Sequence, residues 1–264
     1  MSKSPSIMLL AVLNVIGFIG VVVVNALANA LPLAGKGTGE LSDQYPNLFV
    51  PSGLTFSIWG IIYILLAIYV TYGLVQSIRM PAPGVSFMQR IGFLFLISCC
   101  ANVAWIFFWH HELLPASLTT MVILLGTLAA IYLRLNVGRS AAAPTERYLV
   151  QMPMSVYFGW ITVATIANVT ALLVSYKWGR FGLSEQLWAI VMIGIATALV
   201  LVMLFNRNDI FYALVVDWAV VGILLKRTAD SRAPAQGVIV ASIVGISVIS
   251  LAIIVQLLRG RVYR

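Results

Sequence analysis

The stretch PSGLTFSIWGIIYILLAIYVTYGLVQ, residues Pro51–Gln76, decides what kind of fold this chain forms. It is uncharged and apolar for more than about 20 residues, the length that a helix needs to cross the hydrocarbon core of a bilayer. Proline lacks the N–H that a first helical turn leaves unpaired, so Pro51 predicts the start of the helix. Phe56, Trp59 and Tyr63 follow at helical spacing, and their three rings therefore share one face.

An aromatic belt at the membrane interface explains any one of these rings but not the set. Tyr63 lies about two turns deeper than Phe56, which places it below the interface. The aromatic face therefore either packs against a neighbouring helix or lines a pocket.

The composition of the whole chain predicts a polytopic membrane protein. Of its 264 residues, 61% are hydrophobic and 9% are charged, and the mean hydropathy is +1.02. A water-soluble protein of this length needs a polar exterior that such a composition does not supply. Apolar runs of about 20 residues favour an all-α helix bundle over a barrel of short alternating strands. The net charge of +8 does not indicate a nucleic-acid partner, because the basic residues stand singly or in pairs at the ends of apolar runs.

We expect about eight transmembrane helices. The predicted spans are Ile7–Leu31, Pro51–Gln76, Phe87–Trp109, Leu114–Leu133, Tyr148–Tyr176, Leu183–Phe205, Asp209–Leu225 and Gly237–Leu258. One side of the membrane then receives ten basic residues, namely Lys3, Arg79, Arg90, Arg134, Arg139, Arg147, Arg207, Arg259, Arg261 and Arg264. The other side receives six, namely Lys36, Lys177, Arg180, Lys226, Arg227 and Arg232. Because basic loops stay inside, we expect a bacterial inner-membrane protein with both termini in the cytoplasm.

Three predicted helices carry aromatic and amide residues that together resemble the TspO family, the tryptophan-rich sensory proteins related to the mitochondrial translocator protein. The resemblance rests on these residues, grouped by helix: Pro51, Trp59 and Tyr63; then Asn102, Trp105, Phe107 and Phe108; then Trp160, Ala164 and Asn168. It covers residues 1–176, a five-helix core, and a C-terminal extension of three helices follows over 177–264. Two features depart from the family pattern: Gly53 and Leu54 stand where an extra Trp is expected, and the proline of the fifth helix is displaced to Pro153.

The resemblance implies a pocket between helices that binds a flat hydrophobic ligand, such as a porphyrin, another tetrapyrrole or a sterol-like molecule, and that senses or carries it. Light-dependent porphyrin breakdown, assigned to some members, is not carried over, and we favour a protein that is not an enzyme. The chain contains no Gly-rich phosphate loop and no serine-nucleophile motif. The expected partners are the lipid bilayer and a hydrophobic small molecule, with a homodimer left open.

The candidate ligand-binding residues lie on single faces of three predicted helices. They are Phe56, Trp59, Tyr63, Asn102, Trp105, Trp160 and Asn168. Trp and Tyr offer flat apolar faces to a planar ring and polar edges that orient it. We expect these side chains to converge on one cavity beneath the long polar connection Leu33–Val50, since connections of this length often cover binding sites. The two asparagines either bond each other or orient a polar edge of the ligand.

Two alternative functions compete with ligand binding. Asp217 lies near the middle of the seventh predicted span, where an acid is rare and points to function. No Lys or Arg lies mid-span to pair with it, so burial would favour its neutral, hydrogen-bonding form. A proton-coupled transporter would use such a residue, whereas a structural membrane subunit would have no pocket at all. No metal site is expected, because the adjacent His110, His111 and Glu112 do not all face one ion.

Overall fold

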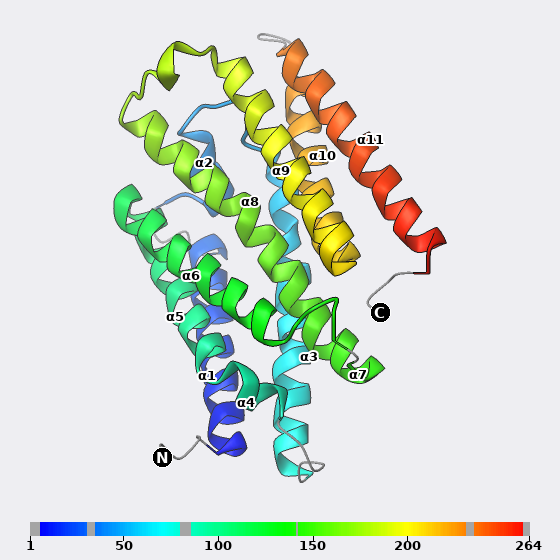
Figure 1. Cartoon of the computed structure of the whole chain (residues 1–264). Helices are drawn as coiled ribbons and strands as arrows, with labels where there is room; N and C mark the ends of the chain where they lie inside the picture. The colour runs from blue at the N-terminus through cyan, green and yellow to red at the C-terminus, as the bar shows by residue number, and fades with distance from the viewer. Residues whose placement is uncertain (1–5, 31–34, 80–85, 141, 231–234, 261–264) are drawn as a thin grey trace.

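The computed structural model describes residues 6–30, 35–79, 86–140, 142–230 and 235–260, and this part of the chain is helical and contains no strand (Figure 1). The predicted all-α bundle is confirmed. The helices are α1 (Ile7–Ala30), α2 (Thr38–Asp43), η1 (Gly53–Ser57), α3 (Ile58–Ile78), α4 (Phe87–Ile91), α5 (Leu94–His110), α6 (Leu114–Arg134), α7 (Pro144–Glu146), η2 (Arg147–Gln151), α8 (Met152–Ser175), η3 (Arg180–Gly182), α9 (Glu185–Arg207), α10 (Ile210–Ala229) and α11 (Gln236–Leu258).

Five long helices pack as a closed ring. α1 packs against α3 and α5, α6 packs against α5 and α8, and a contact between α3 and α8 completes the ring. The three later helices α9, α10 and α11 pack against one another, and α10 joins them to the ring through α8 and η1. The predicted division of the chain at residue 176 falls between α8 and η3, and it stays a prediction.

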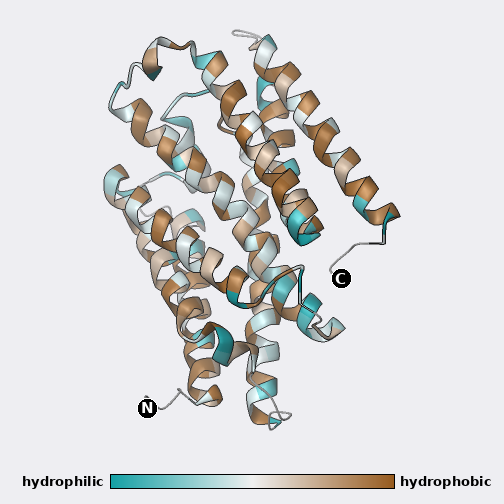
Figure 2. Ribbon diagram, in the orientation of Figure 1, coloured by the Kyte–Doolittle hydropathy of each residue, from teal (hydrophilic) through white to brown (hydrophobic). Residues whose placement is uncertain are grey.

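The outer surface of the bundle is apolar. Large side chains such as Ile16, Ile64 and Leu251 are 58%, 64% and 62% exposed, and hydrophobic residues run along the whole of α1, α9 and α11 (Figure 2). Within the described residues, six helices are long and apolar enough to cross a membrane. An exterior of this kind is stable when lipid covers it.

Two of the eight predicted spans fall short of the length and composition of the other six. α5 has 17 residues, which reach about 25 Å against a hydrocarbon core of about 30 Å. α10 has 20 residues but carries Asp217, Lys226 and Arg227. Half of the residues of α10 are buried, so it is shielded from lipid by its neighbours and tolerates charge better than an exposed helix. The number eight therefore stays a prediction.

Three predicted helices differ locally from the structure. The span Phe87–Trp109 is broken at Gly92, so α4 and α5 are separate helices. Gly92 has a φ of +58°, a left-handed backbone conformation that glycine adopts without steric cost. The span Pro51–Gln76 begins later than predicted, with the 3₁₀ turn η1, and Pro51 lies before the helix. The span Tyr148–Tyr176 begins with the π-helical turn η2, next to Pro153, which has no N–H to continue a regular ladder.

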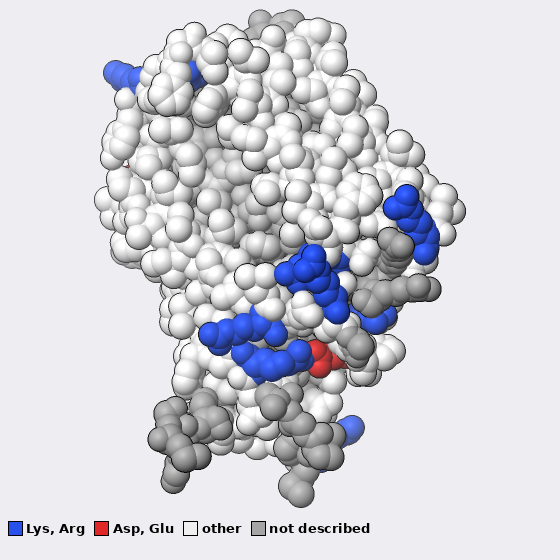
Figure 3. Space-filling model, viewed as in Figure 1, with Lys and Arg blue, Asp and Glu red and all other residues white. Residues whose placement is uncertain are grey.

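Basic side chains lie toward the two ends of the bundle. On the face in Figure 3, a broad uncharged band separates a few cations at one end from a larger group toward the other. The first turn of α1 and the last turn of α11 both lie away from α2 (Figure 1). Lys3, Arg232, Arg261 and Arg264, four of the residues used for the predicted orientation, lie outside the described residues.

A tight joint between η1 and α10 holds the C-terminal helices against the ring. The amide of Ser52 donates to the carbonyl oxygen of Gly222 at 3.0 Å, and Trp218 Nε1 donates to the carbonyl oxygen of Thr55 at 3.0 Å. A Cβ atom on Gly222 would overlap Thr55 Oγ1 and lie 2.9 Å from Thr55 Cβ. Glycine at position 222 therefore allows the close approach.

We predict that Gly222→Ala destabilises the protein by about 1–3 kcal/mol, the usual cost of adding a methyl group to a packed contact. The measurement is thermal unfolding of the purified protein in a neutral detergent. Gly60→Ala is the matched control, since a Cβ there meets nothing within 4 Å. Equal melting temperatures for the two variants would contradict the proposed joint.

Candidate functional site

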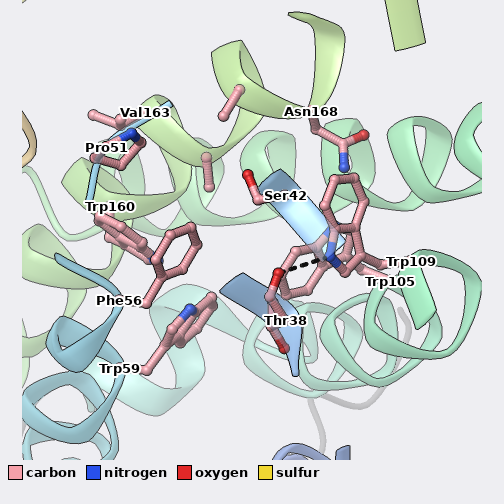
Figure 4. Close-up of a pocket in the computed structure, with 12 residues that line it drawn as sticks. Thr38, Ser42, Pro51, Phe56, Trp59, Trp105, Trp109, Trp160, Val163 and Asn168 are labelled. Atoms are coloured by element: carbon pink, nitrogen blue, oxygen red, sulfur yellow. Dashed lines mark hydrogen bonds between the residues drawn. The ribbon is translucent and has the colours of Figure 1, made fainter. Parts of the chain in front are cut away.

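An aromatic cavity lies inside the ring, between α3, α5 and α8 and beneath α2 (Figure 4). Its lining consists of Thr38, Ser42, Pro51, Phe56, Trp59, Trp105, Trp109, Trp160, Val163, Ala164, Ala167 and Asn168. In Figure 4, Phe56, Trp59 and Trp160 lie on one side of the space, and Thr38, Trp105 and Trp109 lie on the other. The free volume between these side chains is about 40 Å³, which is room for no more than a few water molecules.

The structure brings five of the seven predicted residues to this cavity: Phe56, Trp59, Trp105, Trp160 and Asn168. Tyr63 and Asn102 do not line it. Tyr63 lies behind Trp59, with the two rings stacked at a centroid distance of 5.7 Å. Asn102 belongs to a hydrogen-bond chain between helices. The role of all seven residues in ligand binding stays a prediction.

Trp59 is the hub of the aromatic cluster. Its ring stacks on Trp105 at a centroid distance of 5.8 Å and meets the edge of Trp160 at 6.2 Å, at an interplanar angle of 83°. Trp160 in turn makes an edge contact with Phe56 at 5.9 Å. Offset-stacked and edge contacts of this kind each add about 0.5–1.5 kcal/mol beyond the buried area. One residue of α3 therefore holds α5 and α8 in register around the cavity.

Several polar atoms of the lining are buried without a protein partner. Trp105 Nε1 and Trp160 Nε1 make no hydrogen bond within the described chain. Asn168 donates from Nδ2 to Ser117 Oγ at 3.0 Å, whereas its Oδ1 atom has no partner within the described residues. Most buried polar groups in proteins are paired, so two donors and one acceptor without partners among the lining residues of one cavity are unusual.

Asn102 links three helices of the ring. Asn25 of α1 donates from Nδ2 to Asn102 Oδ1 at 2.8 Å, and Asn102 donates from Nδ2 to the hydroxyl of Tyr157 on α8 at 3.0 Å. All three residues are buried. The two asparagines of the predicted site do not bond each other, since Asn168 pairs with Ser117 instead.

Residues 35–50, which we call the lid, cover the cavity and are tied to several helices. Trp109 Nε1 donates to the carbonyl oxygen of Thr38 at 3.3 Å, and the Thr38 hydroxyl lies 3.1 Å from His110 Nε2. The hydroxyl of Tyr45 donates to Glu112 Oε2 at 3.1 Å. Burial first, and then the Glu112 carboxylate, raise the pKa of Tyr45 to about 12, so this donor keeps its proton at neutral pH.

Several lining residues were missed by the sequence analysis. Thr38 and Ser42 come from α2, a six-residue helix with no apolar period that could have placed it over the pocket. Trp109 lies one turn after Trp105 on α5, and Val163 and Ala167 lie on the same face of α8 as Trp160, so helical spacing could have predicted all three. Ala164, part of the resemblance noted above, lines the cavity as well.

Asp217 does not line the aromatic cavity. Its Oδ2 atom accepts a hydrogen bond of 3.4 Å from Ser250 on α11, and its Oδ1 atom is buried without a partner in the described chain. Proton coupling at Asp217 stays a prediction. A second acid of α10 was missed: Asp209 is fully buried and accepts hydrogen bonds from Tyr132, Ser155 and the amide of Tyr212.

These features define a helical integral membrane protein with an aromatic cavity inside a ring of five helices. The family model described as TSPO-like protein matches residues 11–255, and the chain belongs to this family. The match extends beyond residue 176 and includes α9, α10 and most of α11. Membership suggests a membrane protein that binds a ligand. No curated protein and no solved structure matches the chain.

We predict that Asn102→Leu destabilises the protein by about 1–3 kcal/mol, because it leaves the amide of Asn25 and the hydroxyl of Tyr157 without their shared partner. Thermal unfolding in a neutral detergent measures the change. Ser98→Ala on the same helix is the control, since Ser98 bonds only to Phe95 of its own turn. If Asn102→Leu is as stable as Ser98→Ala, the hydrogen-bond chain does not hold the ring together.

Proposed function

We propose that this protein binds a flat hydrophobic ligand, a tetrapyrrole or a sterol-like molecule, in the aromatic cavity beneath the lid, and that it senses or carries this ligand. The observation that carries the proposal is the combination of aromatic faces with unpartnered polar atoms. Phe56 and four indole rings line one space, and three polar atoms of its lining, Trp105 Nε1, Trp160 Nε1 and Asn168 Oδ1, have no hydrogen-bond partner within the described residues. Apolar faces would stack on the ligand, and these atoms would orient its polar edge.

Binding requires the cavity to widen. Its free volume of about 40 Å³ is far below the roughly 300–1,000 Å³ of ordinary ligand pockets. Phe56 and Trp59 are only partly buried, so they have room to turn aside. The lid is a short segment tied to the helices by hydrogen bonds at Thr38 and Tyr45 and by an ion pair of Asp43, and we expect it to move together with these two rings when a ligand enters. The bound ligand would replace contacts between the aromatic side chains that now fill most of this space.

The test is the quenching of tryptophan fluorescence by a planar tetrapyrrole, pyropheophorbide a, added to the purified protein in a neutral detergent. We expect saturable quenching. Trp59→Ala and Trp105→Ala should each weaken binding several-fold, because losing one stacking ring costs on the order of 1 kcal/mol. Trp188→Ala is the matched control, because Trp188 lies on α9 and lines a different pocket with Trp178.

Two results would contradict this proposal. The first is linear, unsaturated quenching that is the same for the parent and the three variants, which would indicate partition into the detergent. The second is saturable binding with the same dissociation constant in all four proteins, which would place the ligand elsewhere.

The bacterial inner membrane, with both termini in the cytoplasm, is the proposed location. The support is the excess of basic residues on the side of the predicted termini. A reporter that is active only in the cytoplasm, fused after Arg264, should be active, and the same reporter inserted at the exposed Gly35, between α1 and α2, should not. An active insertion at Gly35 together with an inactive C-terminal fusion would reverse this orientation.

A further inference from the structure

A polar pocket adjoins the aromatic cavity at the outer face of the lid. It lies between residues 42–50 of the lid and the last turn of α10, and its free volume is about 280 Å³. Ser42 lines both spaces, and the consecutive residues Val50 and Pro51 line the polar pocket and the aromatic cavity respectively. The two spaces are therefore neighbours that share part of their lining.

Arg227 is the unusual residue of the polar pocket. It is 7% exposed, its Nε atom is buried without a hydrogen-bond partner, and it forms no ion pair within the described chain. A guanidinium group carries five N–H donors and a charge that remains at any physiological pH. Burying such a group is costly unless an acceptor or an anion pairs with it.

The ordinary explanation does not account for this burial. A basic residue in the last turn of a helix is favoured by the helix dipole, and both Lys226 and Arg227 occupy that turn. This effect operates equally well in an exposed side chain. Lys226 is the more exposed of the two and already pairs with Asp43 of the lid. Both line the pocket, but only Arg227 is left there without an ion pair or a side-chain hydrogen bond among the described residues.

We propose that Arg227 binds the carboxylate of an amphipathic ligand whose flat apolar ring occupies the aromatic cavity, an inference that rests on the proposed function. Arginine forms paired, charge-assisted hydrogen bonds with a carboxylate, and these are stronger in a buried site than in water. Asp43, Glu185, Lys226 and Asp230 also line the polar pocket, and Lys226 pairs with Asp43. Carboxylates so close to Arg227 disfavour a doubly charged phosphate more than a singly charged acid, and this comparison favours a ligand with one acid group.

The experiment compares pyropheophorbide a, which has one carboxyl group, with its methyl ester, using the fluorescence titration described above. The full chain is kept in a neutral detergent. In the parent protein we expect the acid to bind roughly tenfold or more tightly than the ester, which corresponds to the loss of one or two charge-assisted hydrogen bonds. Arg227→Gln should lower the affinity for the acid to that for the ester and leave the affinity for the ester unchanged.

Two further variants separate pairing from general attraction. Arg227→Lys keeps the charge but not the forked geometry, so it should retain only part of the preference for the acid, and it replaces Arg227→Gln if that variant does not fold. Arg180→Gln removes an exposed arginine of a neighbouring pocket. It should keep the full preference if Arg227 alone provides the contact.

Equal affinities of the parent for acid and ester would overturn this inference and leave the proposed function intact. A preference for the acid that survives in Arg227→Gln would do the same. Failure of both compounds to bind would instead overturn the proposed function. A repeat in phosphatidylcholine nanodiscs with and without phosphatidylglycerol identifies the occupant. If the acid binds more tightly than the ester only without phosphatidylglycerol, Arg227 is assigned to a lipid headgroup and the carboxylate ligand is contradicted. If the acid binds more tightly in both kinds of nanodisc, the carboxylate ligand is supported.

Discussion

The hydrogen-bond chain from Asn25 through Asn102 to Tyr157 is the constraint on which the ring of helices depends. In lipid no water is available to pair with a buried amide, so these side chains pair with groups of the protein, and Asn102 takes both of its partners from other helices. The bonds of 2.8 and 3.0 Å fix α1, α5 and α8 relative to one another. An apolar contact could slide along the helices, whereas an amide that leaves its partner loses the full hydrogen bond.

The aromatic cavity depends on the same arrangement. Trp105 lies three residues after Asn102 on α5, and Trp160 lies three residues after Tyr157 on α8, so the hydrogen bonds set the positions of both indoles one turn further along. Trp59 of α3 then fills the space between them. The rings leave a small free volume of about 40 Å³ between them.

Much of the bundle and part of the site could be predicted from the sequence, and the remainder depends on contacts between distant segments. The faces of Trp59, Trp105 and Trp160 follow from helical spacing alone. Gly92 gave no signal within an apolar run that it would break a helix, because a glycine there is compatible with either conformation. Thr38 and Ser42 reach the cavity only because the lid folds back over α5, which no local pattern in the lid dictates.

The charged residues of α10 and its N-cap differ in how many hydrogen bonds and ion pairs the protein gives them. This difference distinguishes residues with a structural role from candidates for a functional one. Asp209 accepts bonds from two side chains and a backbone amide at the start of the helix, as a capping residue does. Asp217 accepts one long bond from Ser250, and Arg227 makes none with the part of the chain that the structure describes. A fully paired charge is explained by the fold that pairs it, whereas an unpaired one adds cost without stability. Arg227 lines a pocket that shares Ser42 with the aromatic cavity. A ligand bound in both spaces would therefore offset the free-energy cost of burying its guanidinium group.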